Sequence, residues 1–231
     1  MQKKVVIAIA IFLMGVAGGF ASRVFWPYIG DSQLEPGPVY LTETRQTYIQ
    51  ENIALVGAIE RSARTVVAVR TQLQSGKALE GSGLIVTSDG LMVTLAELVP
   101  FGADFNFFVE GERVPYQILK RDLSENLALI KIAKSSLITA GFARQDRLQM
   151  GERVFLVGTV FEEDASAKLA NEGMVRAFDE DSIQTSIIEE PFLAGSVLFN
   201  IEGEILGINT VDSAGRVNAI PVSKIRAFVG I

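Results

Sequence analysis

The chain opens on an apolar block with charged residues only near its edges. Residues Val5–Ala21 form an uninterrupted run of 17 apolar and small residues, preceded by two lysines. A helix over this run is about 26 Å long, close to the roughly 30 Å hydrocarbon core of a bilayer. Trp26 and Tyr28 follow, where an interfacial aromatic belt lies in membrane helices. We therefore expect residues 1–28 to form an N-terminal transmembrane helix with a cytoplasmic N-terminus.

A cleaved signal peptide is the alternative interpretation of this block. Gly19-Phe20-Ala21 resembles the small-x-small site at which a leader is removed. The run is longer than most signal-peptide cores and has an aromatic flank, so an uncleaved anchor is favoured. Because the segment has no polar face, a helix that is merely buried in the protein is also disfavoured.

A linker and a second helix follow the apolar block. Residues 29–44 contain prolines and glycines typical of a linker. Residues 45–62 have the period of a short amphipathic helix. Its apolar positions recur at intervals of three and four residues: Ile49, Ile53, Val56 and Ile59. We expect this helix to cap the domain that follows, in preference to binding a partner.

Beyond Thr65 the pattern changes to short, β-rich apolar runs separated by Gly, Asp and Ser. There are twelve such runs: 65–69, 83–86, 91–95, 105–109, 116–120, 127–132, 153–158, 174–178, 182–187, 196–200, 205–211 and 217–222. Short strands at this spacing predict an all-β sandwich or a pair of barrels within residues 45–231. Residues 223–229 predict a short closing helix.

The composition removes several kinds of chemistry. The 231 residues include no cysteine and no histidine, so a thiol nucleophile, a disulfide and an imidazole base are all excluded. We expect no metal and no cofactor. Beyond residue 23 the chain carries 18 basic and 27 acidic residues, a net charge of −9. Such a domain repels nucleic acid, which is therefore not an expected partner.

Several segments resemble the HtrA/Deg type of trypsin-like serine protease, in the order and spacing of that family. They are GSGLIVTSDGLMVTLAELV (81–99), VEGERVPYQILKRDLSENLALIKI (109–132), LQMGERVFLVG (148–158), EGMVRA (172–177), IQTSIIEEPFLAGSVLFNIEGEILGINT (183–210) and NAIPV (218–222). The similarity covers roughly residues 50 to 229. It implies a trypsin-like double six-stranded antiparallel β-barrel with a cleft between the barrels. We also expect the domain to lack the PDZ module that many family members append.

The resemblance places a degenerate catalytic triad on this chain. The family's histidine, aspartate and serine fall on Glu97, Asn126 and Ala194. Ala194 has no nucleophilic atom, and Glu97 is a poor proton shuttle at neutral pH. We expect the Asn126 amide to donate a hydrogen bond to the Glu97 carboxylate, which would preserve shape without catalysis.

The family's oxyanion loop, Gly-Asn-Ser, is replaced by Phe192-Leu193-Ala194. A phenylalanine in place of glycine either reorganises this turn or projects its ring into the cleft. Ser196 is expected to be an ordinary packing residue. The acids Glu189 and Glu190 are expected to be solvated, although paired carboxylates near Glu97 could bind a cation.

These features predict an exported, membrane-anchored pseudoprotease of the bacterial cell envelope that binds a peptide or protein. The expected binding edge comprises Gly215, Arg216, Val217, Asn218 and Ala219, where an extended peptide would add a strand. A regulatory subunit of an active HtrA-like protease is one alternative, since the family commonly forms trimers. A peptidase with non-standard catalytic residues is the other. A homo- or hetero-oligomer is compatible with each.

Overall fold

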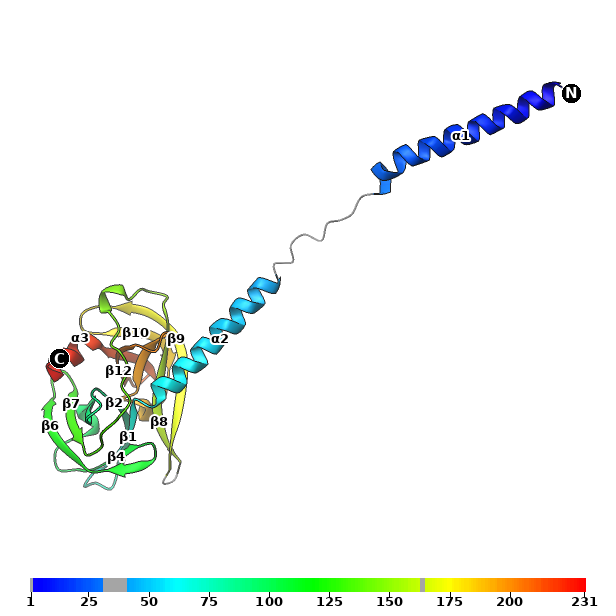
Figure 1. Ribbon diagram of the computed structural model, residues 1–231. Coiled ribbons are helices and arrows are strands. Elements are labelled where there is room, and N and C mark those ends of the chain that lie inside the picture. The colour runs from blue at the N-terminus through cyan, green and yellow to red at the C-terminus, as the bar shows by residue number, and fades with distance from the viewer. Residues whose placement is uncertain (1, 31–40, 163–164) are drawn as a thin grey trace. The chain divides into compact units, whose positions relative to one another are not determined.

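The computed structural model describes residues 2–30, 41–162 and 165–231 and divides the chain into two compact units, residues 1–48 and 49–231. Helix α1 spans Gln2–Gly30 and helix α2 spans Leu41–Ala63 (Figure 1). Within these described ranges, no helix combines the length and the apolarity needed to cross a membrane. Of the predicted linker, residues 31–40 lie outside the described residues, and the flanking positions belong to the two helices.

The remainder of the chain consists almost entirely of short strands. They are β1 (Val66–Gln72), β2 (Ala78–Ile85), β3 (Leu91–Leu95), β4 (Asp104–Val109), β5 (Glu112–Val114), β6 (Tyr116–Asp122), β7 (Leu127–Ile132), β8 (Arg153–Glu162), β9 (Ala165–Phe178), β10 (Ile183–Ile188), β11 (Val197–Asn200), β12 (Ile205–Val211) and β13 (Arg216–Pro221). Three 3-10 turns, η1 (Ala96–Leu98), η2 (Gln145–Arg147) and η3 (Pro191–Leu193), and helix α3 (Val222–Val229) complete this part. Each of the twelve predicted strands and the closing helix has a counterpart.

The first half of the β domain is a seven-stranded antiparallel sheet with the order β5-β4-β1-β2-β3-β7-β6. Its two end strands are consecutive in the chain and are separated only by Pro115, which has no N–H to continue a ladder. The sheet nevertheless curls, because Phe105 and Phe107 of β4 meet Tyr116 of β6 edge-on, with ring centroids 6.1 and 4.8 Å apart.

The second half is a closed six-stranded barrel with the order β10-β13-β12-β11-β8-β9. The predicted all-β trypsin-like fold is therefore confirmed, with one correction. Only the second predicted six-stranded barrel is closed, and the first is a curled sheet whose ladder is interrupted at Pro115. One hydrophobic cluster runs between the two halves and includes Phe155 and Phe199, stacked with centroids 5.3 Å apart.

The face of α2 that packs on the β domain differs from the predicted one. Ala58 is fully buried, and Leu55 and Ile59 pack against the same hydrophobic cluster. Ile53 and Val56, which the periodicity assigns to the apolar face, are 65% and 49% exposed. The apolar residues of this helix are thus spread over two of its faces. Only tertiary contact selects the face that is buried.

The β8–β9 hairpin extends beyond the strands that the sequence predicts. The two strands pair from Arg153↔Met174 out to Glu162↔Ala165. The apolar pattern ends near residue 158 because both faces of the outer ribbon are largely exposed. Phe161 on this ribbon packs edge-on against Phe108 of β4, with centroids 5.5 Å apart. The hairpin therefore ties the barrel to the curled sheet.

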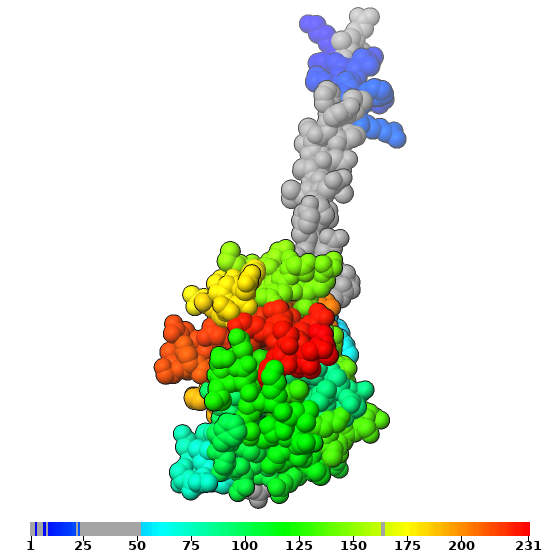
Figure 2. Space-filling model, turned by 90° about the vertical axis from the view of Figure 1, so that its left-hand side faces the viewer, coloured from blue at the N-terminus to red at the C-terminus, as the bar shows by residue number. Residues whose placement is uncertain are grey.

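Helix α3 ties the two halves together from the surface (Figure 2). Lys224 Nζ lies 2.8 Å from a carboxylate oxygen of Glu125, beside β7, and 2.7 Å from Asp181, beside β10. The pKa of Lys224 is raised by its hydrogen bonds to these two carboxylates, and the bond to Asp181 has the larger effect. Lys120 of β6 lies 4.3 Å from the ring centroid of Phe228.

Candidate active-site cleft

Strand β2 lies beside two of the three segments that carry the predicted triad positions. The Ser82 N–H donates a hydrogen bond of 3.0 Å to the carbonyl of Ala194. A Cβ built on Gly81 would lie 2.5 Å from the Leu98 side chain and 2.6 Å from the Ala194 carbonyl oxygen. Because Leu98 follows Glu97 in η1, Gly81 of β2 lies beside both the turn that carries Glu97 and the loop that carries Ala194.

Glu97 and Asn126 are hydrogen-bonded, but not through the groups that the sequence predicts. The backbone N–H of Glu97 donates to the Asn126 side-chain oxygen at 3.0 Å, and the Ala96 N–H donates to the Asn126 carbonyl at 3.1 Å. The Glu97 carboxylate is exposed and takes no part. The predicted amide-to-carboxylate bond is therefore wrong: Asn126 holds the backbone of η1 in place.

The turn before Asn126 explains its position. The Asp122 carboxylate accepts hydrogen bonds from the Ser124 hydroxyl and from the N–H groups of Ser124 and Glu125. The hydrogen bond from the Ser124 hydroxyl lowers the pKa of Asp122, and the bond from the Glu125 N–H lowers it further. This turn delivers Asn126 at φ 52°, a left-handed conformation that asparagine tolerates better than most residues.

The oxyanion loop forms a 3-10 turn whose own carbonyls accept its N–H groups. The Leu193 N–H donates to the Glu190 carbonyl at 3.0 Å, and the Ala194 N–H donates to the Pro191 carbonyl at 3.1 Å. In trypsin-like proteases the oxyanion hole uses the N–H groups of the nucleophile and of the residue two positions before it. The first of these, that of Ala194, is already engaged in this chain.

The side chains of the oxyanion loop point to different environments. Leu193 is fully buried, and its side chain lies 2.7 Å from a Cβ built on Gly158. Phe192 is 39% exposed and Ile188, at the end of β10, is 68% exposed. Leu193 therefore fills the barrel interior, while Phe192 and Ile188 present apolar surface to solvent.

A fully buried polar layer supports the loop from behind. The Ser82 hydroxyl accepts the Thr159 N–H at 2.9 Å, and the Thr159 hydroxyl donates to the Gly81 carbonyl at 2.8 Å. The Asn209 amide donates to the Ser196 hydroxyl at 2.9 Å. Ser196 is thus a buried structural residue and cannot act as a surface nucleophile.

The predicted binding edge, Gly215 to Ala219, is not open. Within β13, Asn218 and Ala219 pair with β10 on one side and with β12 on the other. Arg216 also faces Ile188 of β10, and the Val217 carbonyl accepts the Thr185 hydroxyl at 2.9 Å. Both edges of β13 are paired because the barrel is closed. An alternating apolar run in the sequence does not show which strands will pair.

The neighbouring strand β12 does have an open edge near the cleft. Both polar backbone groups of Asn209 point away from β13, since they bond Ser196 and Gly195 at 2.7 and 2.8 Å. Strand alternation directs the N–H and C=O of Val211 to the same side. The ladder with β11 ends at Ile208, so within the described residues no strand pairs with Val211 on that side.

Comparison with known proteins agrees with this geometry. A profile of the trypsin-like peptidase domain matches residues 81–208. A probable periplasmic serine endoprotease DegP-like of Chlamydia pneumoniae is 31% identical over 154 residues, covering 63% of this chain and 31% of that protein. Serine protease HTRA1 of Xenopus laevis is 36% identical over 166 residues, covering 66% and 36%. This chain belongs to the trypsin-like peptidase domain family and is of the HtrA/Deg type.

A solved structure supports the fold of this HtrA-type chain. The HtrA-type protease AlgW with tripeptide superposes with a TM-score of 0.68 at 24% identity, covering 76% of this chain and 62% of that one. The chain spans about a third of the length of the two curated relatives above.

Acidic residues do not assemble a cation site in this HtrA-type cleft. Glu189 accepts a 2.6 Å hydrogen bond from the Asn171 amide. Within the parts of the chain that the structure describes, no group of three or more acids is close enough to hold a metal ion. The sequence analysis did not predict the Val211 edge or the polar layer. The spacing of Ser82, Thr159 and Asn209 carries no local signal.

Proposed function

We propose that this chain is a catalytically inactive, membrane-anchored HtrA-like domain that binds an extended peptide or protein segment in the cell envelope. The observation that carries the proposal is the loop at Ala194. This position has no nucleophilic atom, and its N–H donates to the Pro191 carbonyl rather than pointing to a reaction centre.

The absence of a proton shuttle supports inactivity. The chain has no histidine, and acyl transfer by a trypsin-like mechanism requires a base that takes and returns a proton. The residue at the histidine position, Glu97, has an exposed carboxylate, and Asn126 binds backbone rather than that carboxylate. Loss of the base and of the nucleophile removes both halves of the chemical step.

Peptide binding requires none of those groups. The unpaired backbone of Val211 offers one donor and one acceptor to an added strand. Exposed Ile188 and Phe192 supply apolar surface on the loop that follows β10. Main-chain hydrogen bonds together with apolar side-chain contacts are the usual basis of strand addition, so the proposed binding edge moves from Gly215–Ala219 to Val211.

The envelope location rests on the N-terminal block and on the relatives. The block from Val5 to Ala21 contains only apolar and small residues, which favours association with lipid. Phe12, Met14 and Phe20 of α1 are each more than 70% exposed, so their apolar surface is available to lipid. The Chlamydia relatives are named as periplasmic.

Two measurements on the full-length chain in its native membrane test the proposal. The first is cleavage of casein and of fluorogenic peptides, for which we expect no turnover above a buffer control. The second places a photoreactive amino acid at Val211 or Phe192 and identifies cross-linked partners by mass spectrometry. A photoreactive residue at the exposed Thr139 serves as the control.

Recurrent partners at Val211 and Phe192 but not at Thr139 would support binding at the cleft. Equal labelling at all three positions would contradict it. Reproducible turnover that disappears in Glu97→Gln would replace the proposal with a peptidase of non-standard chemistry. Recovery of an active HtrA-type protease as the dominant partner would favour the regulatory-subunit alternative.

A further inference from the structure

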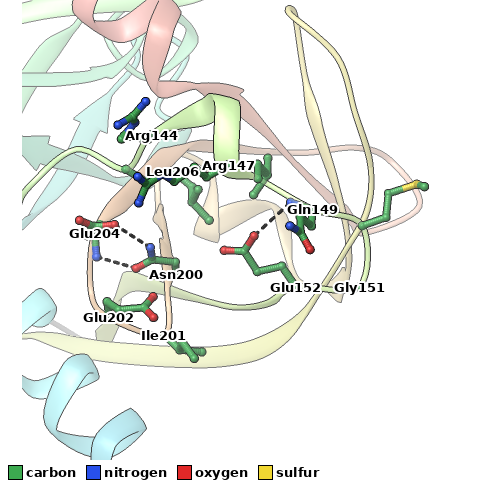
Figure 3. A pocket seen from close by; sticks show the side chains of 13 residues that line it. Arg144, Arg147, Gln149, Gly151, Glu152, Asn200, Ile201, Glu202, Glu204 and Leu206 are labelled. Carbon is green, nitrogen blue, oxygen red and sulfur yellow. Dashed lines mark hydrogen bonds between the residues drawn. The ribbon is translucent and has the colours of Figure 1, made fainter.

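A second hollow lies on the closed barrel, built by residues that the cleft does not use. It is a cavity of about 750 Å³ between the segment from Ala143 to Glu152 and the β11–β12 hairpin (Figure 3). This volume is within the range of about 300–1,000 Å³ usual for ligand sites. The cavity is therefore large enough to receive several side chains of a partner.

The floor of the cavity is apolar. Ala143, Leu148 and Leu206 line it and are buried, with exposures of 8, 6 and 3%. Met150 and Ile201 line it as well and are 72 and 40% exposed. An apolar side chain placed here would remove its own surface and that of Met150 and Ile201 from water.

Charges of opposite sign line the cavity without pairing with each other. Arg147 of η2, Glu152 and Glu202 form no ion pair within the described residues, whereas Arg144 is paired with Asp146 at 2.7 Å. Figure 3 shows Glu152 and Glu202 extending toward each other from opposite walls. Within the described residues, the Glu152 carboxylate accepts one hydrogen bond, from the Gln149 N–H at 3.1 Å. The Glu204 carboxylate, which accepts the Asn200 amide at 2.9 Å, also lines the cavity and forms no ion pair within the described residues. One cationic and three anionic groups are thus available to bind a ligand.

We propose that this cavity is an exosite that binds a short peptide segment carrying an apolar side chain between a basic and an acidic one. The ammonium of the basic side chain lies between Glu152 and Glu202, and the carboxylate of the acidic one meets the Arg147 guanidinium. The apolar side chain rests on Leu148 and Leu206. The site is independent of the cleft and adds a second point of contact for a partner protein.

The probe is a fluorescein-labelled peptide of sequence Gly-Lys-Leu-Glu-Gly with an amidated C-terminus, measured by fluorescence anisotropy with the full-length chain in detergent. We expect saturable binding that is lost when the peptide leucine is replaced by serine. Because exposed charge pairs are worth about 0.2–1 kcal/mol, Arg147→Glu and Glu202→Lys should each weaken binding by up to about fivefold.

Charge reversal on the peptide identifies the contacts directly. Arg147→Glu should regain affinity for Gly-Lys-Leu-Lys-Gly, and Glu202→Lys should regain affinity for Gly-Glu-Leu-Glu-Gly. The matched controls Arg113→Glu and Glu180→Lys, at exposed positions outside the cavity, should leave the affinity of the original peptide unchanged. Thermal unfolding of every variant verifies that the fold is intact.

Three outcomes would overturn the exosite. They are no saturable binding by the natural chain, equal weakening in the control variants, and absence of rescue by the charge-reversed peptides. Phe192→Ala separates the exosite from the cleft. We expect it to leave this peptide's affinity unchanged, and loss of binding in that variant would place the peptide in the cleft instead.

Discussion

The positions that face the cleft and the polar layer directly behind them differ in almost every respect. Glu97 is exposed, and neither it nor Ala194 supplies the group that acyl transfer requires. Behind them, Ser82, Thr159 and Asn209 are completely buried and joined to their surroundings by hydrogen bonds. Two hydrogen bonds join the two regions, one from the Ser82 N–H to the Ala194 carbonyl and one from the Gly195 N–H to the Asn209 carbonyl.

This difference separates what the fold needs from what catalysis needs. A buried polar group that loses its partner costs about 1–3 kcal/mol, so each hydrogen bond of the layer contributes to the stability of the fold. A side chain at the cleft surface has no such constraint, because water satisfies it. The proposed loss of the nucleophile and the base is therefore compatible with the trypsin-like architecture.

The largest expected effect comes from an attempt to rebuild the reaction centre. The triple variant Glu97→His, Asn126→Asp, Ala194→Ser supplies a triad but keeps the Phe192-Leu193 turn. Because the N–H of residue 194 donates to Pro191, we expect no detectable hydrolysis of an activated ester or peptide substrate. Adding Phe192→Gly and Leu193→Asn should raise the rate at least about 100-fold, since one oxyanion donor is worth about 10²–10³.

Equal rates in the triple variant and in the variant with all five substitutions would show that the loop conformation plays no part in inactivity. The variant with the other four substitutions and Ala194 retained is the control for contaminating protease. Circular dichroism of each variant verifies that the β domain is folded.

The next largest effect is expected at the joint between the two regions. Gly195 has φ +78°, and a Cβ there would lie 2.1 Å from the Ser82 carbonyl oxygen. Gly195→Ala should lower the free energy of unfolding by about 3 kcal/mol, measured by urea denaturation. The control is Gly76→Ala. Gly76 has a similar φ of +84°, but a Cβ built there has no atom within 4 Å, so only about 1 kcal/mol of backbone strain is expected. Similar losses in both would indicate that the loop can move away from Ser82.

A smaller effect is expected within the polar layer itself. Thr159→Val preserves shape but removes the hydroxyl that donates to the Gly81 carbonyl and contacts the Ser82 hydroxyl at 2.9 Å. We expect a loss of about 2 kcal/mol in the free energy of unfolding. Thr139→Val on the exposed surface should change stability by no more than about 0.5 kcal/mol. Indistinguishable values would show that the layer contributes no net stability.

The smallest effect concerns the turn that follows the open edge of β12. The hydrogen bond from the Arg216 N–H lowers the pKa of Asp212, and the hydrogen bond from the Arg216 guanidinium lowers it further. A carboxyl with a lower pKa in the folded state stabilises the fold above its unfolded value of about 3.9 and loses that contribution as the pH falls. Asp212→Asn should therefore lower the melting temperature slightly at pH 7, with the difference closing as the pH falls through the lowered pKa of the folded state. A difference that is constant with pH would exclude this electrostatic origin.

The local pattern of apolar residues predicted where the strands lie but not which strands or surfaces they pack against. The twelve predicted strands exist because alternating or continuous apolar runs bury at least one face whatever their neighbours are. The outer part of the β8–β9 hairpin was missed because both its faces are largely exposed. The α2 periodicity identified a helix but assigned Ile53 to the wrong face, because its apolar positions are spread around the axis.

By itself, the sequence determined that this chain is an all-β, HtrA-type domain, and its resemblance to the family predicts that Glu97, Asn126 and Ala194 stand at the triad positions. Those conclusions depend on residue identity and spacing, which are local properties. Only the tertiary structure decided that Asn126 binds the backbone of η1, that Ala194 donates to Pro191, and that the open edge lies at Val211. Each of these depends on which groups, distant in the chain, reach hydrogen-bonding distance when the barrel closes, and periodicity does not encode such pairing.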